Sequence, residues 1–308
     1  MFDSKKEAFK ELVAGLQTHI CTAIEEIDGK ATFKIEDWTR EGFGYGSTRV
    51  ISEGNIFEKG GVNISAVEGA LPKSLQEKLE TEESDFFATG ISLVLHPQNP
   101  FIPTVHANYR YFELYDKETG AIKDQWFGGG ADLTPYYLFE EDAKHFHRVH
   151  KTVCDATHPE FYPRFKEACD NYFFNHHRDE TRGVGGLFYD HLRADNELNA
   201  NDLFDFAKAA GQAFTEAYLP IVERRKELSW TEKQRYWQEI RRGRYVEFNL
   251  IHDRGTLFGL KTKGRIESIL MSLPPRVRWD YNFQPEPNSA EAKLLEHLKP
   301  IDWLNLNS

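Results

Sequence analysis

Residues 90–116, GISLVLHPQNPFIPTVHANYRYFELYD, constrain the fold more than any other stretch of the sequence. Apolar and polar residues alternate on either side of a loop rich in proline and asparagine, and this period of two is typical of β-strands. One face of the first strand carries Ile91, Leu93 and Leu95. One face of the second carries Ala107, Tyr109 and Tyr111. The stretch therefore predicts two strands that pair antiparallel across the loop.

The other face of this strand pair is partly polar. It would bring together Ser92, His96, His106, Asn108 and Arg110. Half-exposed antiparallel sheets are common, so a merely solvated face is one interpretation. Three glycine-rich polar segments elsewhere favour a functional site instead: FGGGADLTP at 127–135, HHRDETRGVGG at 176–186 and NLIHDRGTLFGLKTKGR at 249–265.

The first of these segments runs three glycines into Asp132. A phosphate-binding loop of the Walker type needs a lysine and a hydroxyl after its last glycine, whereas an acidic side chain would repel phosphate. The glycines are better suited to let the backbone approach a bulky neutral or cationic group. Asp132 could also have a structural role and cap the turn at 133–135. The other glycine-rich segment, GFGYGS at 42–47, is predicted to be a flexible loop.

Local patterns predict the remaining elements. Helical spacing predicts helices from a capping box at Ser4 and Glu7 to Gly29, and at 138–178, 201–242 and 290–299. β-Branched and aromatic runs predict strands at 48–65, 86–126 and 246–260, with a short helix or strand at 265–275. Strands, then helices, then strands indicate one α+β domain over residues 1–308.

Composition excludes several classes of function. The formal net charge of −11 argues against nucleic acid as a partner, because phosphate binding needs clustered cations. The N-terminus MFDSKKEAFKEL is charged and no segment approaches a membrane span, so we expect a cytoplasmic protein without membrane insertion. Three cysteines without a CxxC spacing exclude an iron–sulfur cluster. No strand–turn–helix unit suggests a site for NAD or flavin.

Several histidines invite a metal interpretation, since imidazole is a common metal ligand. They are His145, His147, His150, His176 and His177. However, no HExxH spacing is present, and positions 145 and 147 point to different sides of a helix. Histidines of the surface or the core are the alternative interpretation.

Six segments together resemble the oxygen-dependent coproporphyrinogen III oxidase family. They are EKGGVNIS at 58–65, HANYRYFE at 106–113, FGGGADLTP at 127–135, HHRDETRGVGGLFYD at 176–190, YVEFNLIHDRGT at 245–256 and GRIESILMSLPP at 264–275. The resemblance covers nearly the whole chain. It implies the oxidative decarboxylation of two propionate side chains of coproporphyrinogen III to vinyl groups in haem biosynthesis. Dioxygen is the co-substrate, and the products are protoporphyrinogen IX, carbon dioxide and hydrogen peroxide.

The resemblance also carries expectations about architecture. It implies a large antiparallel sheet flanked by helices on both faces, in a single catalytic domain. It further implies a homodimer, with residues 245–280 contributing to the interface.

Site residues follow from the resemblance and from the chemistry of a tetrapyrrole with four carboxylates. Arg110 and Arg265 would hold rim carboxylates through charge-assisted hydrogen bonds. The other substrate-binding residues are expected to be Ser92, Asn108, Tyr109, Arg182, Lys263 and Gly264. Fewer cations are expected at the reacting propionate, because tight pairing would stabilise the ground state more than the transition state.

The catalytic residues are expected to be His106, Asp132 and Asp253. Imidazole exchanges protons near neutral pH, so His106 suits proton transfer at the reacting side chain, and the resemblance implies a proton donor there. Asp132 or Asp253 would accept hydrogen bonds from the pyrrole N–H groups. Alternatively, Asp253 forms a structural ion pair with Arg254 or Arg265.

A metal is left open. The resemblance implies a divalent cation on His96, His106, His145 and His177, but the reaction can also be drawn without one, because the electron-rich pyrrole itself reacts with oxygen. Two other functions remain as alternatives. One is a non-catalytic tetrapyrrole carrier, and the other is a histidine-dependent metal oxygenase for a different carboxylated ring.

Overall fold

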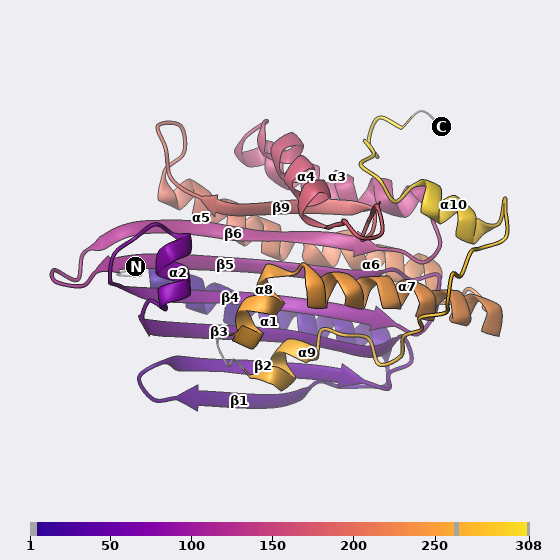
Figure 1. The fold of residues 1–308 in the computed structure, drawn as a ribbon, viewed down its shortest axis with the longest axis horizontal. Coiled ribbons are helices and arrows are strands. Elements are labelled where there is room, and N and C mark those ends of the chain that lie inside the picture. Colours follow the sequence, from indigo (N-terminus) through magenta and orange to yellow (C-terminus); the bar gives the residue numbers. More distant parts are fainter. Residues whose placement is uncertain (1–4, 262–264, 307–308) are drawn as a thin grey trace.

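The computed structural model describes residues 5–261 and 265–306, and an antiparallel sheet forms its centre (Figure 1). The sheet has seven strands in the order β1-β2-β3-β4-β5-β6-β9. Their bounds are β1 Lys34–Arg40, β2 Gly44–Ser52, β3 Phe57–Ala70, β4 Ser84–Pro97, β5 Thr104–Asp116, β6 Ile122–Thr134 and β9 Gly185–Leu192. A separate hairpin joins β7 Phe174–Asn175 to β8 Glu180–Thr181.

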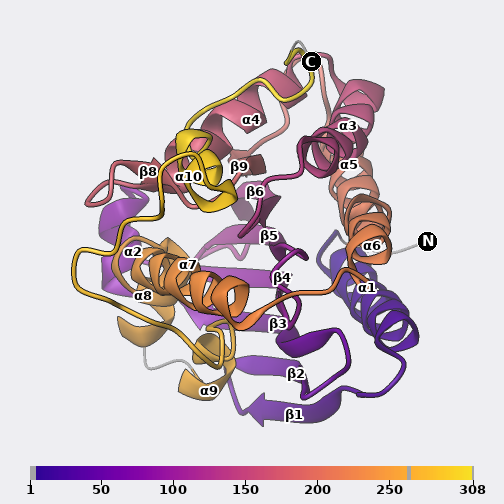
Figure 2. The same cartoon turned by 90° about the vertical axis from the view of Figure 1, so that its right-hand side faces the viewer.

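One face of the sheet is covered by helices and forms the main core (Figure 2). The helices are α1 Lys5–Asp28, α3 Glu140–Thr157, α5 Ala200–Gln212 and α6 Phe214–Arg225. The alternation in β4 and β5 is confirmed, because its apolar positions are all buried here: Ile91, Leu93, Leu95, Ala107, Tyr109 and Tyr111. This burial fixes the register, since a slip of one residue would turn the apolar set to the other face.

The opposite face lies under helices from the second half of the chain (Figure 2). They are α7 Glu232–Ile251, α8 Arg254–Lys261, α9 Ile266–Leu270 and α10 Ala290–Glu296, while α4 Phe161–Tyr172 packs beside β9 and α2 Lys73–Lys78 follows β3. The prediction of an α+β fold with helices on both faces of the sheet is confirmed. Within the described residues, no helix combines the length and apolar character needed to cross a bilayer.

The prediction of strands at 246–260 was wrong. This segment forms the end of α7 and most of α8. The run VEFNLI has high β-propensity, but the helix starts upstream at a capping box between Thr231 and Gln234. Its buried residues run without a break from Trp237 to Gly243 and continue through Tyr245 and Phe248, so most sides of the helix are enclosed. Burial of the helix against the rest of the molecule overrides local propensity.

The glycine-rich segment 42–47 is also not a flexible loop. Its first two residues form a turn, and Gly44 already begins β2, which pairs with β1. The predicted first helix ends before Gly29, whose φ is +68°, but Ser4 of the expected capping box lies outside the described residues. The long helical stretches predicted at 138–178 and 201–242 are divided among α3, α4, α5, α6 and the first half of α7.

Three buried histidines make stability depend on pH. His96, His147 and His150 are at most 1% exposed. Burial lowers the pKa of His147 to about 3 and that of His150 to about 4, and burial with nearby Arg242 lowers the pKa of His96 well below its usual value. In the unfolded chain these side chains titrate near pH 6.5, so below that pH only the unfolded state takes up the protons. Stability should therefore fall as the pH falls from about 6.5 toward 4.

We expect the free energy of unfolding to be about 3–4 kcal/mol lower at pH 5.5 than at pH 7, from about 1.4 kcal/mol per pH unit and histidine. Urea unfolding at the two pH values measures the loss. This window lies above the ordinary range of carboxylates, so histidines dominate it. The variant His150→Phe should remove about a third of the loss. Equal stability at both pH values would contradict the explanation.

Candidate active site

A cavity of about 370 Å³ lies between the polar face of the sheet and the helices above it. The sheet contributes Asn63, Ser65, Ser92, Val94, His106, Asn108, Arg110, Gly129 and Gly130. The segments around α4 and β9 contribute Tyr172, Phe173, Arg182 and Phe188. Helices α7 to α9 and their connections contribute Tyr245, Asn249, Asp253, Gly255, Thr256, Ser268, Ile269, Met271 and Ser272. This volume falls within the usual range of small-molecule sites, about 300–1,000 Å³.

The sheet residues of the site form rows across neighbouring strands. One row runs Asn63, Ser92, Asn108, Gly130. The row beside it runs Ser65, Gly90, Arg110, Gly128, and the row on the other side runs Val94, His106, Asp132. The predicted antiparallel pairing of β4 and β5 is confirmed. Residues from three of the quoted segments therefore share one surface because they are in register, although they lie far apart in sequence.

His106 belongs to a chain of polar contacts that continues below the cavity. Its Nδ1 lies 2.8 Å from Asp132 Oδ1. Arg182 donates from Nη2 to both carboxylate oxygens of Asp132, at 2.8 Å each, and from Nη1 to Asn249 Oδ1 at 2.9 Å. With Nδ1 engaged by a carboxylate, the other ring nitrogen of His106 is left for the cavity. The arrangement can hold the ring in one orientation and present Nε2 for proton exchange.

The Asp132–Arg182 pair is almost fully buried, with both side chains 2% exposed. Burial opposes ionisation of Asp132, but Arg182 and His106 outweigh burial and keep the pKa of this carboxyl below its usual value. The guanidinium is enclosed by aromatic rings, 4.1 Å from the centroid of Phe173 and 4.7 Å from that of Tyr245. Aromatic rings attract the guanidinium, but a buried charge of this kind is stable only when an opposite charge, here Asp132, is paired with it.

These contacts change the expected roles of Asp132 and Arg182. The Asp132 carboxylate does not line the cavity, because both its oxygens are engaged by Arg182 and His106 below the surface. Arg182 lines the cavity but directs its N–H groups to Asp132 and Asn249. We infer that Asp132 acts through His106 as a positioning residue.

The glycines before Asp132 serve the sheet as well as the cavity. A Cβ on Gly128 would lie 2.5 Å from Arg110 Nε, so Gly128 makes room for that side chain. Gly130 has φ +155°, and a Cβ there would lie 2.1 Å from the carbonyl oxygen of Leu187 in β9. L-residues rarely adopt this conformation. The glycine run therefore allows β5, β6 and β9 to pack closely under the site.

Asp253 is a carboxylate that does line the cavity. Tyr172 donates its hydroxyl proton to Asp253 Oδ1 at 3.0 Å. The other oxygen, Oδ2, accepts from the backbone N–H of Thr256 at 2.7 Å, in the first turn of α8. The alternative of a structural ion pair with Arg254 or Arg265 is not what the structure has, since Arg254 lies over the ring of Tyr172 and Arg265 pairs with Glu36.

Arg110 lies at the rim of the cavity, with its side chain 42% exposed. Its Nη2 is 2.8 Å from Asp190 Oδ1. Burial would raise the pKa of Asp190, but Arg110 and His191 outweigh it and lower the pKa. This pairing uses one nitrogen of the guanidinium, which leaves N–H groups for a ligand carboxylate. Ser92 and Asn108 line the cavity next to Arg110, as predicted.

Other predicted substrate residues are not brought to the cavity. Tyr109 faces the opposite side of the sheet, where it is 1% exposed in the main core, because side chains alternate along β5. Arg265 is exposed, pairs with Glu36 of β1 and does not line the cavity. Lys263 and Gly264 lie outside the described residues.

The four histidines of the expected metal site do not come together. His96 is buried between Thr104 and the carbonyl of Ser272. His145 belongs to α3 on the other face of the sheet and contacts the carbonyl of Glu216. His177 contacts Glu247 and His252, whereas His106 lines the cavity. Residues 5–261 and 265–306 contain no group of three or more His, Cys, Asp or Glu arranged to hold a metal ion. These residues do not fit the expected cation.

Several lining residues were missed from sequence. Asn63 and Ser65 carry a signal, because GGVNIS alternates like the neighbouring strands. Tyr245 and Asn249 lie one turn apart on α7, and Ser268 and Met271 lie in or next to α9. The prediction of strands at 246–260 broke the helix between Tyr245 and Asn249, so the two could not be predicted to lie together. The second pair depends on how α9 packs over β3, where Asn63 donates to the carbonyl of Ser268 at 2.9 Å.

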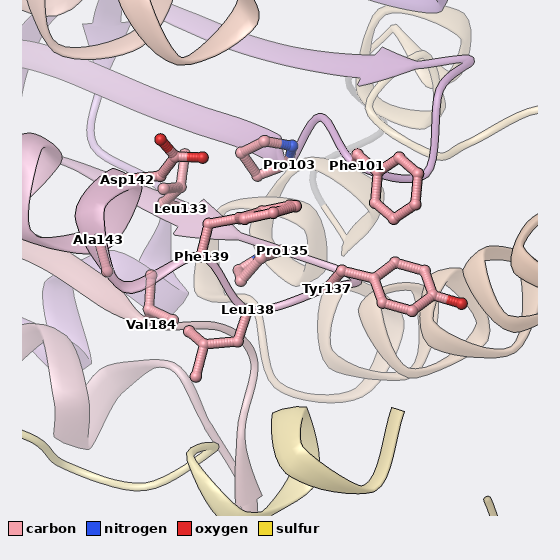
Figure 3. A pocket seen from close by; sticks show the side chains of 10 residues that line it. All are labelled: Phe101, Pro103, Leu133, Pro135, Tyr137, Leu138, Phe139, Asp142, Ala143 and Val184. Atoms are coloured by element: carbon pink, nitrogen blue, oxygen red, sulfur yellow. The ribbon is translucent and has the colours of Figure 1, made fainter. Parts of the chain in front are cut away.

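A second cavity, shown in Figure 3, is too small for an organic substrate. Its volume is about 10 Å³, close to the space of a single water molecule. Figure 3 shows mostly apolar side chains around it, including Pro103, Leu133 and Phe139. Its one carboxylate, Asp142, pairs with Arg224 and Arg225. The larger cavity therefore remains the candidate active site.

Comparison with known proteins agrees with the resemblance seen in the sequence. A family model described as coproporphyrinogen III oxidase matches residues 8–303. The chain is 49% identical over 311 residues to coproporphyrinogen-III oxidase 1, chloroplastic, of Arabidopsis thaliana, covering 98% of this chain and 80% of that protein. It is 50% identical over 327 residues to the oxygen-dependent coproporphyrinogen-III oxidase of Synechococcus sp. (strain CC9605), covering 98% and 88%. The chain therefore belongs to the coproporphyrinogen III oxidase family.

Proposed function

We propose that this chain catalyses the oxygen-dependent conversion of coproporphyrinogen III to protoporphyrinogen IX in haem biosynthesis, as a single catalytic domain. For each of two propionates, the side chain, one O₂ and one proton give a vinyl group, CO₂ and H₂O₂. The two electrons that leave the side chain reduce dioxygen. The observation that carries the proposal is one cavity that contains an imidazole, a rim guanidinium and a carboxylate, in a chain of this family.

The cavity matches the polarity of a tetrapyrrole. Tyr172, Phe173 and Phe188 supply flat apolar walls, and Tyr172 and Phe188 are stacked with ring centroids 4.1 Å apart. Arg110 offers charged donors to a carboxylate at the rim, and Ser92 and Asn108 offer neutral donors. We propose that these three residues hold the acidic groups of the substrate that do not react.

His106 is proposed to deliver the proton that each decarboxylation consumes. Its Nδ1 is fixed by Asp132, which is fixed in turn by Arg182, so Nε2 can stay directed at the substrate. Asp253 is proposed to accept hydrogen bonds from pyrrole N–H groups. A carboxylate in this position favours loss of a pyrrole proton, which makes the ring easier for oxygen to attack. No step is assigned to a metal, because the histidines expected to bind one are dispersed.

Aerobic incubation with coproporphyrinogen III tests the function directly. We expect a tricarboxylic intermediate, then the dicarboxylic product, with release of CO₂. Binding of the substrate without CO₂ release would instead support a tetrapyrrole carrier. Loss of all turnover after exhaustive chelation, with recovery on addition of one cation, would support a metal-dependent oxygenase.

Replacing Arg110 by alanine should raise KM for coproporphyrinogen III by about 10- to 100-fold, because a charge-assisted hydrogen bond to a carboxylate is lost. The change in kcat should be much smaller, since the contact lies away from the reacting group. Steady-state kinetics measure both constants. Arg193→Ala is a matched control, because Arg193 has a similar exposure of 41% and also pairs with an aspartate, Asp124, but does not line the cavity. Equal KM values for the two variants would refute the role of Arg110.

We also propose a homodimer in which residues 245–280 contribute to the interface. This stretch exposes several large apolar side chains, which are typical of interaction surfaces: Leu250, Ile251, Leu260, Ile266 and Trp279. Sedimentation analysis of the protein should give twice the chain mass. The cytoplasm is the proposed location, although the Arabidopsis relative is named as chloroplastic.

A further inference from the structure

The hydroxyl of Tyr245 is a polar group in the active-site cavity that the roles assigned so far do not use. The residue is 2% exposed and lines the cavity. Its buried oxygen has no hydrogen-bond partner among the described residues. Two other tyrosines, Tyr109 and Tyr189, also have buried hydroxyls without partners there, but both lie in the main core and neither lines the cavity. A buried polar group without a partner is rare, and one that faces a cavity can be satisfied by a ligand.

The surroundings of Tyr245 leave its proton available. Asn249, one helical turn later, has its Oδ1 engaged by Arg182 at 2.9 Å, which leaves its NH₂ group as the part of the amide that can approach the phenol. An amide NH₂ group can only donate, so it does not use the proton of the hydroxyl. Burial raises the pKa of Tyr245, which keeps the group protonated. The hydroxyl is therefore a neutral hydrogen-bond donor.

Strand β4 gives the position of this donor along the cavity. The ring of Tyr245 lies against His96, with centroids 5.2 Å apart. On the same strand, Val94 lies two residues before His96 and pairs with His106 of β5. Gly90 lies four residues before Val94 and pairs with Arg110 of β5. At about 3.3 Å per residue, the row of Arg110 is about 13 Å from that of His106. Tyr245 thus belongs to the His106 end of the cavity, and Arg110 to the other.

The two ends differ in charge. Arg182 is a cation close to Tyr245, at 4.7 Å from the centroid of its ring, and it is already neutralised by Asp132. The other polar groups near Tyr245 that line the cavity include the amide of Asn249 and the carboxylate of Asp253, which bring no positive charge. A carboxylate that must leave as CO₂ should not be held by a strong ion pair, because that would stabilise the ground state. A neutral donor can orient this carboxylate and stabilises the ground state less than a cation would.

We propose that the Tyr245 hydroxyl binds the carboxylate of the propionate that reacts, and so places that side chain beside His106. This inference rests on the proposed function. Tyr245 would then be a substrate-binding residue that selects, by its position, which carboxylate of the substrate reaches the imidazole. Arg110 would hold a carboxylate at the opposite end at the same time.

The test compares Tyr245→Phe with Tyr189→Phe. Both changes remove a buried hydroxyl without a partner, so neither should lower the melting temperature. Only Tyr245→Phe should raise KM for coproporphyrinogen III, by about tenfold, with kcat changed far less. Tyr189→Phe should match the wild type in both constants.

Each other outcome decides against the inference. An unchanged KM in Tyr245→Phe overturns it, and so does a lower melting temperature with normal kinetics, since the hydroxyl would then have a structural role. The wild-type enzyme is measured in the same assay. If it does not convert coproporphyrinogen III, the proposed function fails; if it does, and Tyr245→Phe equals it, only the role of Tyr245 fails.

Discussion

Replacing His106 by alanine should lower kcat for coproporphyrinogen III by a factor of about 10²–10⁴, the usual contribution of a positioned acid or base. His106 lines the cavity with its side chain 22% exposed, and its Nδ1 is held 2.8 Å from Asp132. Because the imidazole is proposed to act on the reacting side chain and not to hold the substrate, KM should change little. Single-turnover measurements of CO₂ release under air separate the chemical step from product release.

The matched control is His145→Ala. His145 was also expected to bind a metal, but it lies on α3 across the sheet and contacts only a backbone carbonyl among the described side-chain hydrogen bonds. Its replacement should leave kcat unchanged. Similar large losses in both variants would show that the two histidines act together, as in a shared metal site, and would contradict the assignment of His106 alone. A His106→Ala enzyme with normal kcat would remove the proposed proton donor.

The strand pair at the centre of the site could be predicted from sequence, because neighbouring residues alone determine which side chains share a face. A period of two assigns Asn108 and Arg110 to one face and Tyr109 to the other, and the loop of prolines and asparagines fixes the antiparallel pairing. Tyr109 was expected to bind substrate because of the family resemblance, although it lies in the core. It stands within a matching segment, yet the alternation that places it in the core was already visible in the sequence.

The partners of the acidic residues could not be predicted in the same way. Asp132 and Arg182 are 50 residues apart and meet because β6, which carries Asp132, lies beside β9, which begins three residues after Arg182. The pairing of Asp253 with Tyr172 similarly spans 81 residues. The second pairing depends on Asp253 lying in the short connection between α7 and α8. The strands predicted at 246–260 had the wrong period, so the side of the chain that Asn249 faces, together with Tyr245 one helical turn before it, could not be predicted.

Replacing Asp132 by leucine should have the largest effect on stability, lowering the free energy of unfolding by about 3–5 kcal/mol. The reason is that Arg182 is 2% exposed in its side chain and would remain charged in the interior without its partner. Hydrogen bonds to Asn249 and the surrounding rings do not neutralise that charge. Urea unfolding at pH 7, well above the range in which Asp132 titrates, measures the loss. A change below about 1 kcal/mol, the level of an exposed ion pair, would contradict the buried pairing.

Combining Asp132→Leu with Arg182→Met distinguishes the contribution of the Arg182 contact to stability from that of the His106 contact to turnover. A leucine–methionine pair of similar volume has no buried charge, so the double variant should recover most of the lost stability. The double-mutant cycle should therefore give a favourable coupling energy of several kcal/mol between the two substitutions. Turnover should not recover with it, because His106 still lacks the acceptor that fixes its Nδ1. A double variant that regains stability but keeps a low kcat would therefore assign the ion pair with Arg182 to folding and the contact with His106 to catalysis. If kcat recovered together with stability, the low activity of Asp132→Leu would be a consequence of a loosened fold, and Asp132 would have no positioning role.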